Sequence, residues 1–206
     1  CEETGKGGIE PGERTRVSGP SLLKYPGLAR VYGHPRIIEL SALITEEPKP
    51  FLQEIVANRY IPPHAGVSPH LDEDFGELVP PLMRVTWALF LDDISPESGA
   101  LTYVPGTHWR NYLDRQKPEK ATPTKEEVQQ AEYIPLGLQA GTLILRAADV
   151  WHAVRPIHHL RRYITGSYSS RSRTSQWLEE NMARQIKERK TIPIEEIPAA
   201  IRAYFV

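Results

Sequence analysis

The chain has 206 residues, 40% of them hydrophobic, which is enough for one well-cored domain but short for two. Its 25 Lys and Arg residues nearly balance its 26 Asp and Glu residues, so no charge excess would draw it to nucleic acid or anionic lipid. We therefore expect a single domain over residues 1–206 that acts on a small-molecule or carrier-bound substrate, with no nucleic-acid partner and no membrane partner. Nothing in the composition indicates the oligomeric state.

Two features of the sequence bear on where the protein works. No stretch reaches the roughly 20 consecutive apolar residues of a membrane span, and the N-terminus lacks the basic-then-apolar pattern of a signal peptide. The single cysteine, Cys1, cannot form an internal disulfide, which fits a reducing compartment. We therefore expect a cytoplasmic or otherwise intracellular protein. Because the sequence does not begin with Met, a targeting signal in a preceding segment would not be visible.

The first part of the chain is predicted to be an irregular segment followed by helices. Residues 1–20 are rich in Gly, Glu, Pro and Ser and show almost no apolar periodicity. Over 34–58 the pattern is helical, with a Pro suited to a first helical turn and a second, shorter helix expected over 50–58. The apolar residues at helical spacing are Ile37, Leu40, Leu43 and Ile44.

Residues 67–170 have the pattern of a β domain. Short apolar or alternating runs, such as RVTWALFL and AGTLILR, are separated by clusters of Gly, Pro and Asp. This pattern is typical of an antiparallel β sandwich or barrel. One long polar interruption, residues 115–130, is expected to be a mobile lid or functional loop that borders the pocket mouth.

The C-terminal part of the chain, residues 175–206, returns to a helical pattern. Leu178, Met182 and Ile186 recur every four residues, and Pro198 is placed to begin a last short helix. The chain as a whole is therefore predicted to be mainly β with flanking helices.

The candidate metal site starts from His70 and Asp72. On an extended strand, residues two apart point to the same face, so an imidazole and a carboxylate would converge on one point. Alone the pair is weak evidence, because an exposed strand often carries a His and an Asp for solubility. A second histidine, His152, follows an apolar run that reads as a strand. Two imidazoles and one carboxylate leave three positions open on a metal, as in non-haem iron(II) oxygenases. The alternative for His152 is a core histidine bonded to a backbone carbonyl.

A basic pair, Arg161 and Arg162, begins the next predicted strand. A buried dicarboxylate needs a cation at its far end, and arginine bonds both oxygens of a carboxylate at once. Strand alternation sends the two arginines to opposite faces. Arg161 shares its face with Thr165, whose hydroxyl would donate to the same carboxylate, whereas Arg162 shares its face with Ile164, which suits packing against a covering helix. We therefore expect Arg161 and Thr165 to bind the co-substrate. The alternative is a surface pair that neutralises nearby glutamates.

Three further residues are weaker candidates. Trp87 lies in an apolar run downstream of the metal motif, where it would either wall the co-substrate pocket or pack in the core. Arg84 and Trp109 lie near the ends of predicted strands, where a barrel opens, and we expect them to contact the substrate.

Over residues 34–170 the chain resembles the phytanoyl-CoA dioxygenase family. The motifs that carry the resemblance are His-x-Asp at 70–72, the run DDISPESGAL at 92–101, PGTH at 105–108, and the distal His152 followed by Arg161. The resemblance implies a double-stranded β-helix, or jelly-roll, core over 67–170. It also implies iron(II) as cofactor, 2-oxoglutarate and molecular oxygen as co-substrates, and hydroxylation of an unactivated carbon with formation of succinate and carbon dioxide. His70, Asp72 and His152 are then the catalytic metal ligands.

Two positions depart from the family pattern. Val154 stands where relatives often carry a serine near the co-substrate, so that contact must be made by another residue. Thr142 stands where the family usually has an Asp after Gly141, which affects a turn contact only.

Three other functions fit parts of the pattern. A cupin-type isomerase or oxygenase that does not use 2-oxoglutarate would leave Arg161 without a purpose, and the usual His-x-His motif of cupins is absent. A halogenase needs chloride in the position that Asp72 fills. A non-catalytic metal-binding jelly roll would release no succinate with any substrate. The substrate itself is open among fatty acyl thioesters, amino-acid derivatives, and terpenoid or other natural-product intermediates.

Overall fold

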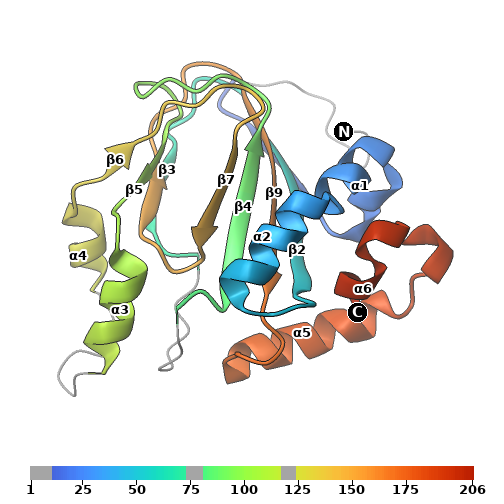
Figure 1. The fold of residues 1–206 in the computed structure, drawn as a ribbon. Coiled ribbons are helices and arrows are strands. Elements are labelled where there is room, and N and C mark those ends of the chain that lie inside the picture. Colours follow the sequence, from blue (N-terminus) through green and yellow to red (C-terminus); the bar gives the residue numbers. More distant parts are fainter. Residues whose placement is uncertain (1–10, 73–80, 117–123) are drawn as a thin grey trace.

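Two antiparallel sheets enclose the centre of the structure, a computed structural model that describes residues 11–72, 81–116 and 124–206 (Figure 1). The larger sheet has five strands in the order β1-β2-β9-β4-β7, and the smaller has four in the order β3-β8-β5-β6. From β3 to β9 the chain passes back and forth between the two sheets, which is the arrangement of a double-stranded β-helix. The jelly-roll core predicted from the sequence is confirmed.

The described chain contains nine strands and nine helical segments. The strands are β1 (Arg14–Ser18), β2 (Phe51–Tyr60), β3 (Val67–His70), β4 (Arg84–Phe90), β5 (Leu101–Tyr103), β6 (Ile134–Pro135), β7 (Leu143–Ala147), β8 (His152–Val154) and β9 (Arg161–Ser169). The helical segments are η1 (Pro20–Lys24), α1 (Pro26–Tyr32), α2 (Pro35–Thr45), α3 (Thr107–Arg115), α4 (Lys125–Gln130), α5 (Gln176–Arg189), η2 (Ile194–Glu196), η3 (Ala199–Ile201) and α6 (Arg202–Phe205).

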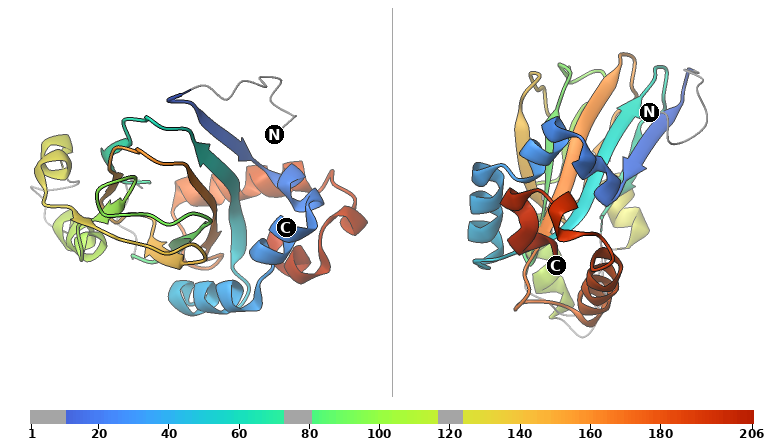
Figure 2. Two further views of the ribbon diagram at one scale, coloured as in Figure 1. Left: turned by 90° about the horizontal axis from the view of Figure 1, so that it is seen from above. Right: turned by 90° about the vertical axis from the view of Figure 1, so that its right-hand side faces the viewer.

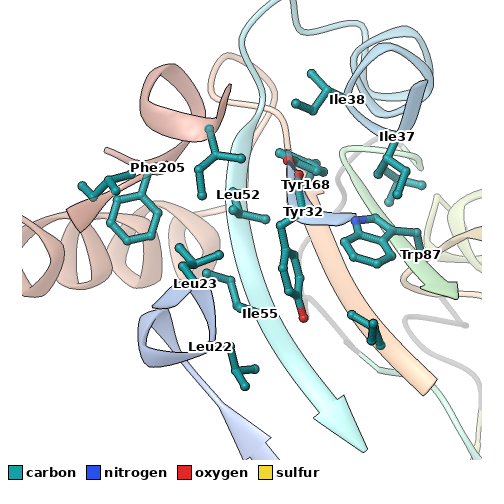
Figure 3. Close-up of a cluster of buried hydrophobic side chains, with 14 residues drawn as sticks. Leu22, Leu23, Tyr32, Ile37, Ile38, Leu52, Ile55, Trp87, Tyr168 and Phe205 are labelled. Carbon is teal, nitrogen blue, oxygen red and sulfur yellow. Dashed lines mark hydrogen bonds between the residues drawn. The ribbon is translucent and has the colours of Figure 1, made fainter. Parts of the chain in front are cut away.

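Helices flank the two sheets on opposite sides (Figure 2). α1, α2 and α6 lie against the outer side of the five-stranded sheet, whereas α3 and α4 lie beside the four-stranded sheet. Buried apolar side chains fill the space between the larger sheet and its helices (Figure 3). Within this layer the Tyr32 hydroxyl accepts a 2.8 Å hydrogen bond from the Val56 N–H and lies 2.9 Å from the Thr165 carbonyl oxygen, which ties α1 to β2 and β9. The outer face of the large sheet is therefore apolar, whereas its inner face carries polar side chains together with apolar ones such as Ala88 and Phe90.

The two faces of β9 carry different side chains. Arg161 and Thr165 point into the space between the sheets, whereas Ile164 packs in the apolar layer on the helix side. Arg162 is exposed and pairs with Asp92, with 2.7 Å between Nη2 and Oδ1. The predicted opposite orientation of Arg161 and Arg162 is therefore confirmed, but Arg162 pairs with Asp92 and does not pack against a covering helix.

The short helix predicted over 50–58 is wrong, because this segment forms strand β2. It pairs with β1 on one edge and with β9 on the other. Its β-branched residues, among them Ile55 and Val56, favour a strand, and pairing on both edges outweighs the helical spacing of its apolar residues. The prediction of an irregular segment over 1–20 is wrong in part, since β1 lies within it. Residues 1–10 lie outside the described residues.

The helix predicted after His34 is present as α2, and its buried face overlaps the predicted one in part, since Ile37 is buried and Ile44 packs against the core. Its buried side chains are Ile37, Ile38, Ser41 and Thr45, and Leu43 is 74% exposed. The face is set by the sheet, because α2 packs across both β4 and β9.

Helices are also found in two later segments. The long polar segment 115–130 contains α4, which begins after a capping box formed by Thr124 and Glu127. Residues 117–123, where the predicted loop is centred, lie outside the described residues. In the C-terminal part, α5 and the short helices after Pro198 lie where the sequence predicts them. Within the described ranges, no helix is long and apolar enough to cross a membrane.

Candidate active site

A cavity of about 190 Å³ lies between the two sheets. The five-stranded sheet contributes side chains from β1, β2, β4, β7 and β9, and the four-stranded sheet contributes side chains from β3, β5 and β8. The polar and aromatic residues that line it are Arg14, Arg16, Glu54, Asn58, Tyr60, His70, Asp72, Thr86, Phe90, Arg146, His152, Arg161, Tyr163 and Thr165. The residues predicted to hold the metal and the far carboxylate of the co-substrate therefore open into one cavity.

The predicted metal ligands His70, Asp72 and His152 converge at one point of this cavity. Cross-strand pairing of β3 with β8 sets His70 opposite His152, with 4.1 Å between the ring centroids. Oδ1 of Asp72 lies 3.6 Å from Nε2 of His70 and 3.3 Å from Nε2 of His152. One ligand atom from each residue lies within 4.8 Å of the others. Such a set of nitrogen and oxygen donors on one side fits a divalent iron ion with open positions for small ligands.

Asp72 reaches this point in a way that strand alternation does not predict. β3 ends at His70, so Asp72 lies beyond the strand. Its backbone N–H donates a 3.3 Å hydrogen bond to the carbonyl of Ala148, in the turn before His152. The carboxylate is therefore positioned by the neighbouring chain segment.

Both imidazoles are held in the orientation that a metal site needs. Nδ1 of His70 donates to the Ser68 carbonyl at 2.8 Å, and Nδ1 of His152 donates to the Val150 carbonyl at 3.0 Å. Because a carbonyl oxygen only accepts, each Nδ1 carries the proton and each Nε2 is left with its lone pair. The backbone bond considered as the alternative for His152 is present, and it orients a ring whose other nitrogen faces Asp72.

The surroundings of the three groups shift their pKa values in different directions. Burial raises the pKa of Asp72, but the Arg146 guanidinium and the two imidazoles outweigh burial and hold that pKa well below its usual range. Hydrogen bonding with Asp72 raises the pKa of His70. Burial and the nearby Arg146 charge lower the pKa of His152. At neutral pH Asp72 is therefore ionised and His152 is neutral. These are the protonation states in which the two groups can bind a metal.

Arg146 on β7 is a site residue that the sequence reasoning missed. Its guanidinium pairs with Oδ2 of Asp72, the oxygen that does not face the histidines, and also donates to the Ala147 carbonyl at 3.3 Å. The signal was present, because Arg146 is the one charged residue in the apolar run AGTLILRAA. A charged residue inside such a strand indicates a partner within the fold.

Arg161 lies deep in the same cavity. It is only 2% exposed, and Nε and Nη1 have no hydrogen-bond partner. Three aromatic rings surround its guanidinium carbon, at 4.5 Å for Tyr163, 5.4 Å for Phe90 and 5.5 Å for Tyr60. Within the described chain no carboxylate pairs with it. A buried guanidinium of this kind is costly unless an anion lies beside it.

Two residues predicted to bind the co-substrate lie on opposite faces of the sheet. Thr165 lines the cavity, and its hydroxyl donates a 2.6 Å hydrogen bond to the Trp87 carbonyl. The Trp87 side chain lies on the helix side, fully buried, with its ring 5.1 Å from that of Tyr32 (Figure 3). The expectation that Trp87 walls the co-substrate pocket is therefore wrong, and its alternative, core packing, is observed. The reason is parity, since Thr86 and Ala88 take the inward positions of β4.

The two predicted substrate contacts are not among the residues that line the cavity. Arg84 is buried, and it donates to Ser167 Oγ at 3.0 Å and to Glu54 Oε2 at 3.3 Å. Trp109 is 49% exposed on α3, next to Tyr112. Their assignment as substrate contacts stays a prediction. The sequence reasoning instead missed Tyr60 and Tyr163, which only the pairing of β2 with β9 brings to Arg161.

A jelly roll that presents two histidines, one carboxylate and a buried arginine to a single cavity defines the class of the 2-oxoglutarate-dependent oxygenases. The family model described as phytanoyl-CoA dioxygenase (PhyH) matches residues 23–159, well over half of the chain, and the chain belongs to this family. The match includes His70, Asp72 and His152 and ends before Arg161. The family resemblance seen in the sequence is therefore confirmed. No curated protein matches the chain.

Several solved structures share the fold. AviO1 from Streptomyces viridochromogenes Tue57 is 19% identical, with a TM-score of 0.63 over 82% of this chain and 72% of that one. HygX from Streptomyces hygroscopicus, with nickel and 2-oxoglutarate bound, is 18% identical, with a TM-score of 0.62 over 82% and 74% of the two chains. The epimerase SnoN from nogalamycin biosynthesis is 18% identical, with a TM-score of 0.56 over 75% of this chain. The chain spans 62% of the length of SnoN.

Proposed function

We propose that the protein is an iron(II)- and 2-oxoglutarate-dependent dioxygenase. One observation carries the proposal: Arg161, buried and without a carboxylate partner among the described residues, opens into the same cavity as His70, Asp72 and His152. A buried cation is costly unless an anion neutralises it. A small dicarboxylate that reaches from the metal to Arg161 provides that anion, which the cupin-type alternative does not.

The comparisons support the same cofactors. HygX was solved with nickel and 2-oxoglutarate, and SnoN was solved in complex with Fe3+, alpha ketoglutarate and nogalamycin RO. The residues of this chain fit such a pair of ligands, since the three donors face one another and the buried guanidinium opens into the same cavity.

Each residue has a distinct part in this proposal. His70 and His152 would hold iron through Nε2, and Asp72 through Oδ1, the atoms that face one another in the structure. When bound, iron(II) with 2-oxoglutarate supplies the oxidative activation of molecular oxygen, with succinate and carbon dioxide as products. Arg161 fixes the far carboxylate, and the rings around it exclude water, which strengthens that charge pair. Exact placement of the co-substrate is the main contribution of the protein.

Thr165 is a second proposed contact to the far carboxylate. It lies on the same face of β9 as Arg161, four residues away. Its hydroxyl proton is donated to the Trp87 carbonyl, so the contact requires the hydroxyl to rotate towards the co-substrate. Val154, where relatives often carry a serine, also lines the cavity and offers no such bond.

We propose hydroxylation of an unactivated carbon as the reaction, on a small-molecule or carrier-bound substrate. HygX was solved with hygromycin B bound, which supports a small molecule. The solved relatives also include an epimerase, SnoN, and a carbocyclase, SnoK, so product analysis must distinguish hydroxylation from these outcomes.

The cofactor assignment is tested by titrating 2-oxoglutarate into the protein with and without nickel(II), which occupies such sites without oxygen chemistry. We expect one 2-oxoglutarate per chain in the presence of nickel and binding at least tenfold weaker without it, because chelation contributes to affinity. Failure of the nickel-loaded protein to bind 2-oxoglutarate would overturn the proposal. Equal affinity with and without nickel would show that the co-substrate does not reach the metal.

A further inference from the structure

Strand β1 carries two arginines on the cavity side of the large sheet. Pairing with β2 sets Arg14 opposite Tyr60 and Arg16 opposite Asn58, and Tyr60 in turn lies opposite Arg161 on β9. Directly opposed residues share a face, so Arg14, Tyr60 and Arg161 form one row across three strands. At about 4.8 Å per strand, Arg14 lies roughly 10 Å from Arg161. Both β1 arginines line the cavity.

Arg14 differs from Arg16 and Arg146, two other arginines of the cavity, in its partners. Its Nη2 donates to Asn58 Oδ1 at 3.2 Å, and its guanidinium carbon lies 5.2 Å from the centre of the Tyr60 ring. Neither contact supplies a negative charge. Arg16, by comparison, lies 2.9 Å from Glu54 Oε1. Of the described carboxylates, none forms an ion pair with Arg14.

The charges of the described residues at the cavity do not balance. Four guanidinium groups stand against two carboxylates, which leaves two positive charges in excess. The guanidinium groups are those of Arg14, Arg16, Arg146 and Arg161, and the carboxylates are those of Glu54 and Asp72. Iron(II) would add two charges and the 2-oxoglutarate dianion would remove two, so the excess remains with both bound. Like charges in a partly enclosed site repel, and a bound anion relieves that repulsion.

In the proposed function, each of the other arginines already has an anionic partner. Arg146 pairs with Asp72, Arg84 and Arg16 share Glu54, and Arg161 is assigned to the co-substrate. Arg14 is exposed at the rim of the cavity and is available to bind a further anion. Because β1 precedes residue 23, it also lies outside the segment that the family model matches.

We infer that the substrate carries an oxyanion, a carboxylate or a phosphate ester, and that Arg14 binds it at the β1 wall of the cavity with Arg16 beside it. This inference rests on the proposed function, since it concerns the third ligand of the same site. The planar guanidinium of Arg14 bonds two oxygens of either group. The neutral bond to Asn58 and the contact with the Tyr60 ring hold the guanidinium in place.

Binding of small probes to the full chain tests the inference. The chain is loaded with nickel and 2-oxoglutarate, and four compounds are titrated: benzoate and its neutral partner benzamide, and phenyl phosphate and its neutral partner phenol. We expect at least one anion to bind about tenfold or more tightly than its neutral partner, because a charge-assisted pair is worth more than a neutral contact. Preference for benzoate identifies a carboxylate, and preference for phenyl phosphate identifies a phosphate ester. Equal affinity within both pairs overturns the inference.

The matched variants are Arg14→Gln and Arg36→Gln, which remove the same charge. Arg36 pairs with Glu39 on the surface of α2, away from the cavity. We expect Arg14→Gln to lower the affinity for the anion about tenfold or more and Arg36→Gln to leave that affinity unchanged. Arg14→Lys should retain part of the affinity for the anion. If Arg14→Gln loses nickel binding, that variant is misfolded, and the inference is then tested with Arg14→Lys and with the wild-type affinities for each anion and its neutral partner.

The 2-oxoglutarate affinity of the same samples separates this inference from the proposed function. If the wild type binds no 2-oxoglutarate, the proposed function fails. If 2-oxoglutarate binds but Arg14→Gln has no effect on the anion, only the inference fails. An anion that binds only when 2-oxoglutarate is absent occupies the Arg161 end of the cavity, which also overturns the inference.

Discussion

Arg146 holds the outer oxygen of Asp72, so the inner oxygen faces the histidines. Oδ2 accepts from the Arg146 guanidinium, and Oδ1 lies 3.3 Å from His152 Nε2. The pair is largely buried, with 14% of the Arg146 side chain and 27% of the Asp72 side chain exposed. The carboxylate therefore offers one oxygen to a metal and keeps the other for the protein.

This relationship predicts that Arg146→Ala destabilises the metal-free protein. Removing one partner of a largely buried ion pair should lower the free energy of unfolding by on the order of 2 kcal/mol. Nickel should reverse part of this loss, because its charge replaces that of Arg146 beside Asp72. Thermal unfolding with and without nickel measures both effects. Arg162→Ala, which breaks the exposed pair with Asp92, is the control and should cost under about 1 kcal/mol. A loss that nickel does not alter would contradict this account.

The metal site itself is tested by removing its ligands. We expect the His70→Ala, His152→Ala double variant, and Asp72→Ala, to lose stoichiometric binding of iron(II) or nickel, since fewer than three donors then remain. His158→Ala changes an exposed histidine and should bind one metal per chain. Metal analysis after dialysis gives the occupancy. Full occupancy in the double variant would show that the metal is held elsewhere.

The co-substrate assignment predicts opposite behaviour for adjacent arginines. Arg161→Ala should weaken 2-oxoglutarate binding to the nickel-loaded protein by about a hundredfold or more, because it removes a buried, charged, bidentate partner. Arg162→Ala should change neither 2-oxoglutarate nor nickel affinity, because Arg162 points to solvent. Calorimetric titration of both variants decides the matter. The reverse pattern would place the co-substrate on the outer face of β9, against the register described above.

Gly99 lies against Arg161 and predicts a milder effect on the same ligand. It has φ +67, and a Cβ placed there would lie 3.1 Å from Cδ of Arg161. Gly99→Ala should therefore displace the guanidinium and weaken 2-oxoglutarate binding, by roughly three- to tenfold. Gly106→Ala is the control, because Gly106 has φ +78 but a Cβ there would meet nothing within 4 Å. Both variants should lose about 1 kcal/mol of stability from backbone strain. If the two variants weaken 2-oxoglutarate binding equally, contact with Arg161 is not the cause of the loss.

The pKa values of the two histidines predict how metal affinity depends on pH. Asp72 raises the pKa of His70 above the ordinary value of 6.5, whereas burial lowers that of His152. A metal binds only the neutral ring, so protons compete with the metal first at His70. Affinity for nickel should therefore decline on acidification while the pH is still above 6.5, with uptake of about one proton per released metal. Titrations between pH 8 and pH 5.5 measure this. A flat affinity from pH 8 to pH 6.5 would argue against a raised pKa for His70.

Local patterns in the sequence determined the chemistry of the site. Side chains alternate with a period of two along a strand, so Arg161 and Arg162 had to face opposite sides, and the apolar or polar character of their neighbours indicated which side was inward. His70 and Asp72 alone were weak evidence, and the metal site was recognised because His152 completes a set of two imidazoles and one carboxylate. The choice between Arg161 and Arg162 depends on a single segment, which is why the sequence alone supported it.

Tertiary structure decided whatever depends on which strands lie side by side. Residues 51–60 became a strand because β1 and β9 pair with both of its edges, and Trp87 turned outward because helices cover that face of β4. Arg146 reached Asp72 from a distant part of the chain. Contacts between distant segments are fixed by strand pairing and packing across the whole fold. Local periodicity in the sequence therefore does not predict them.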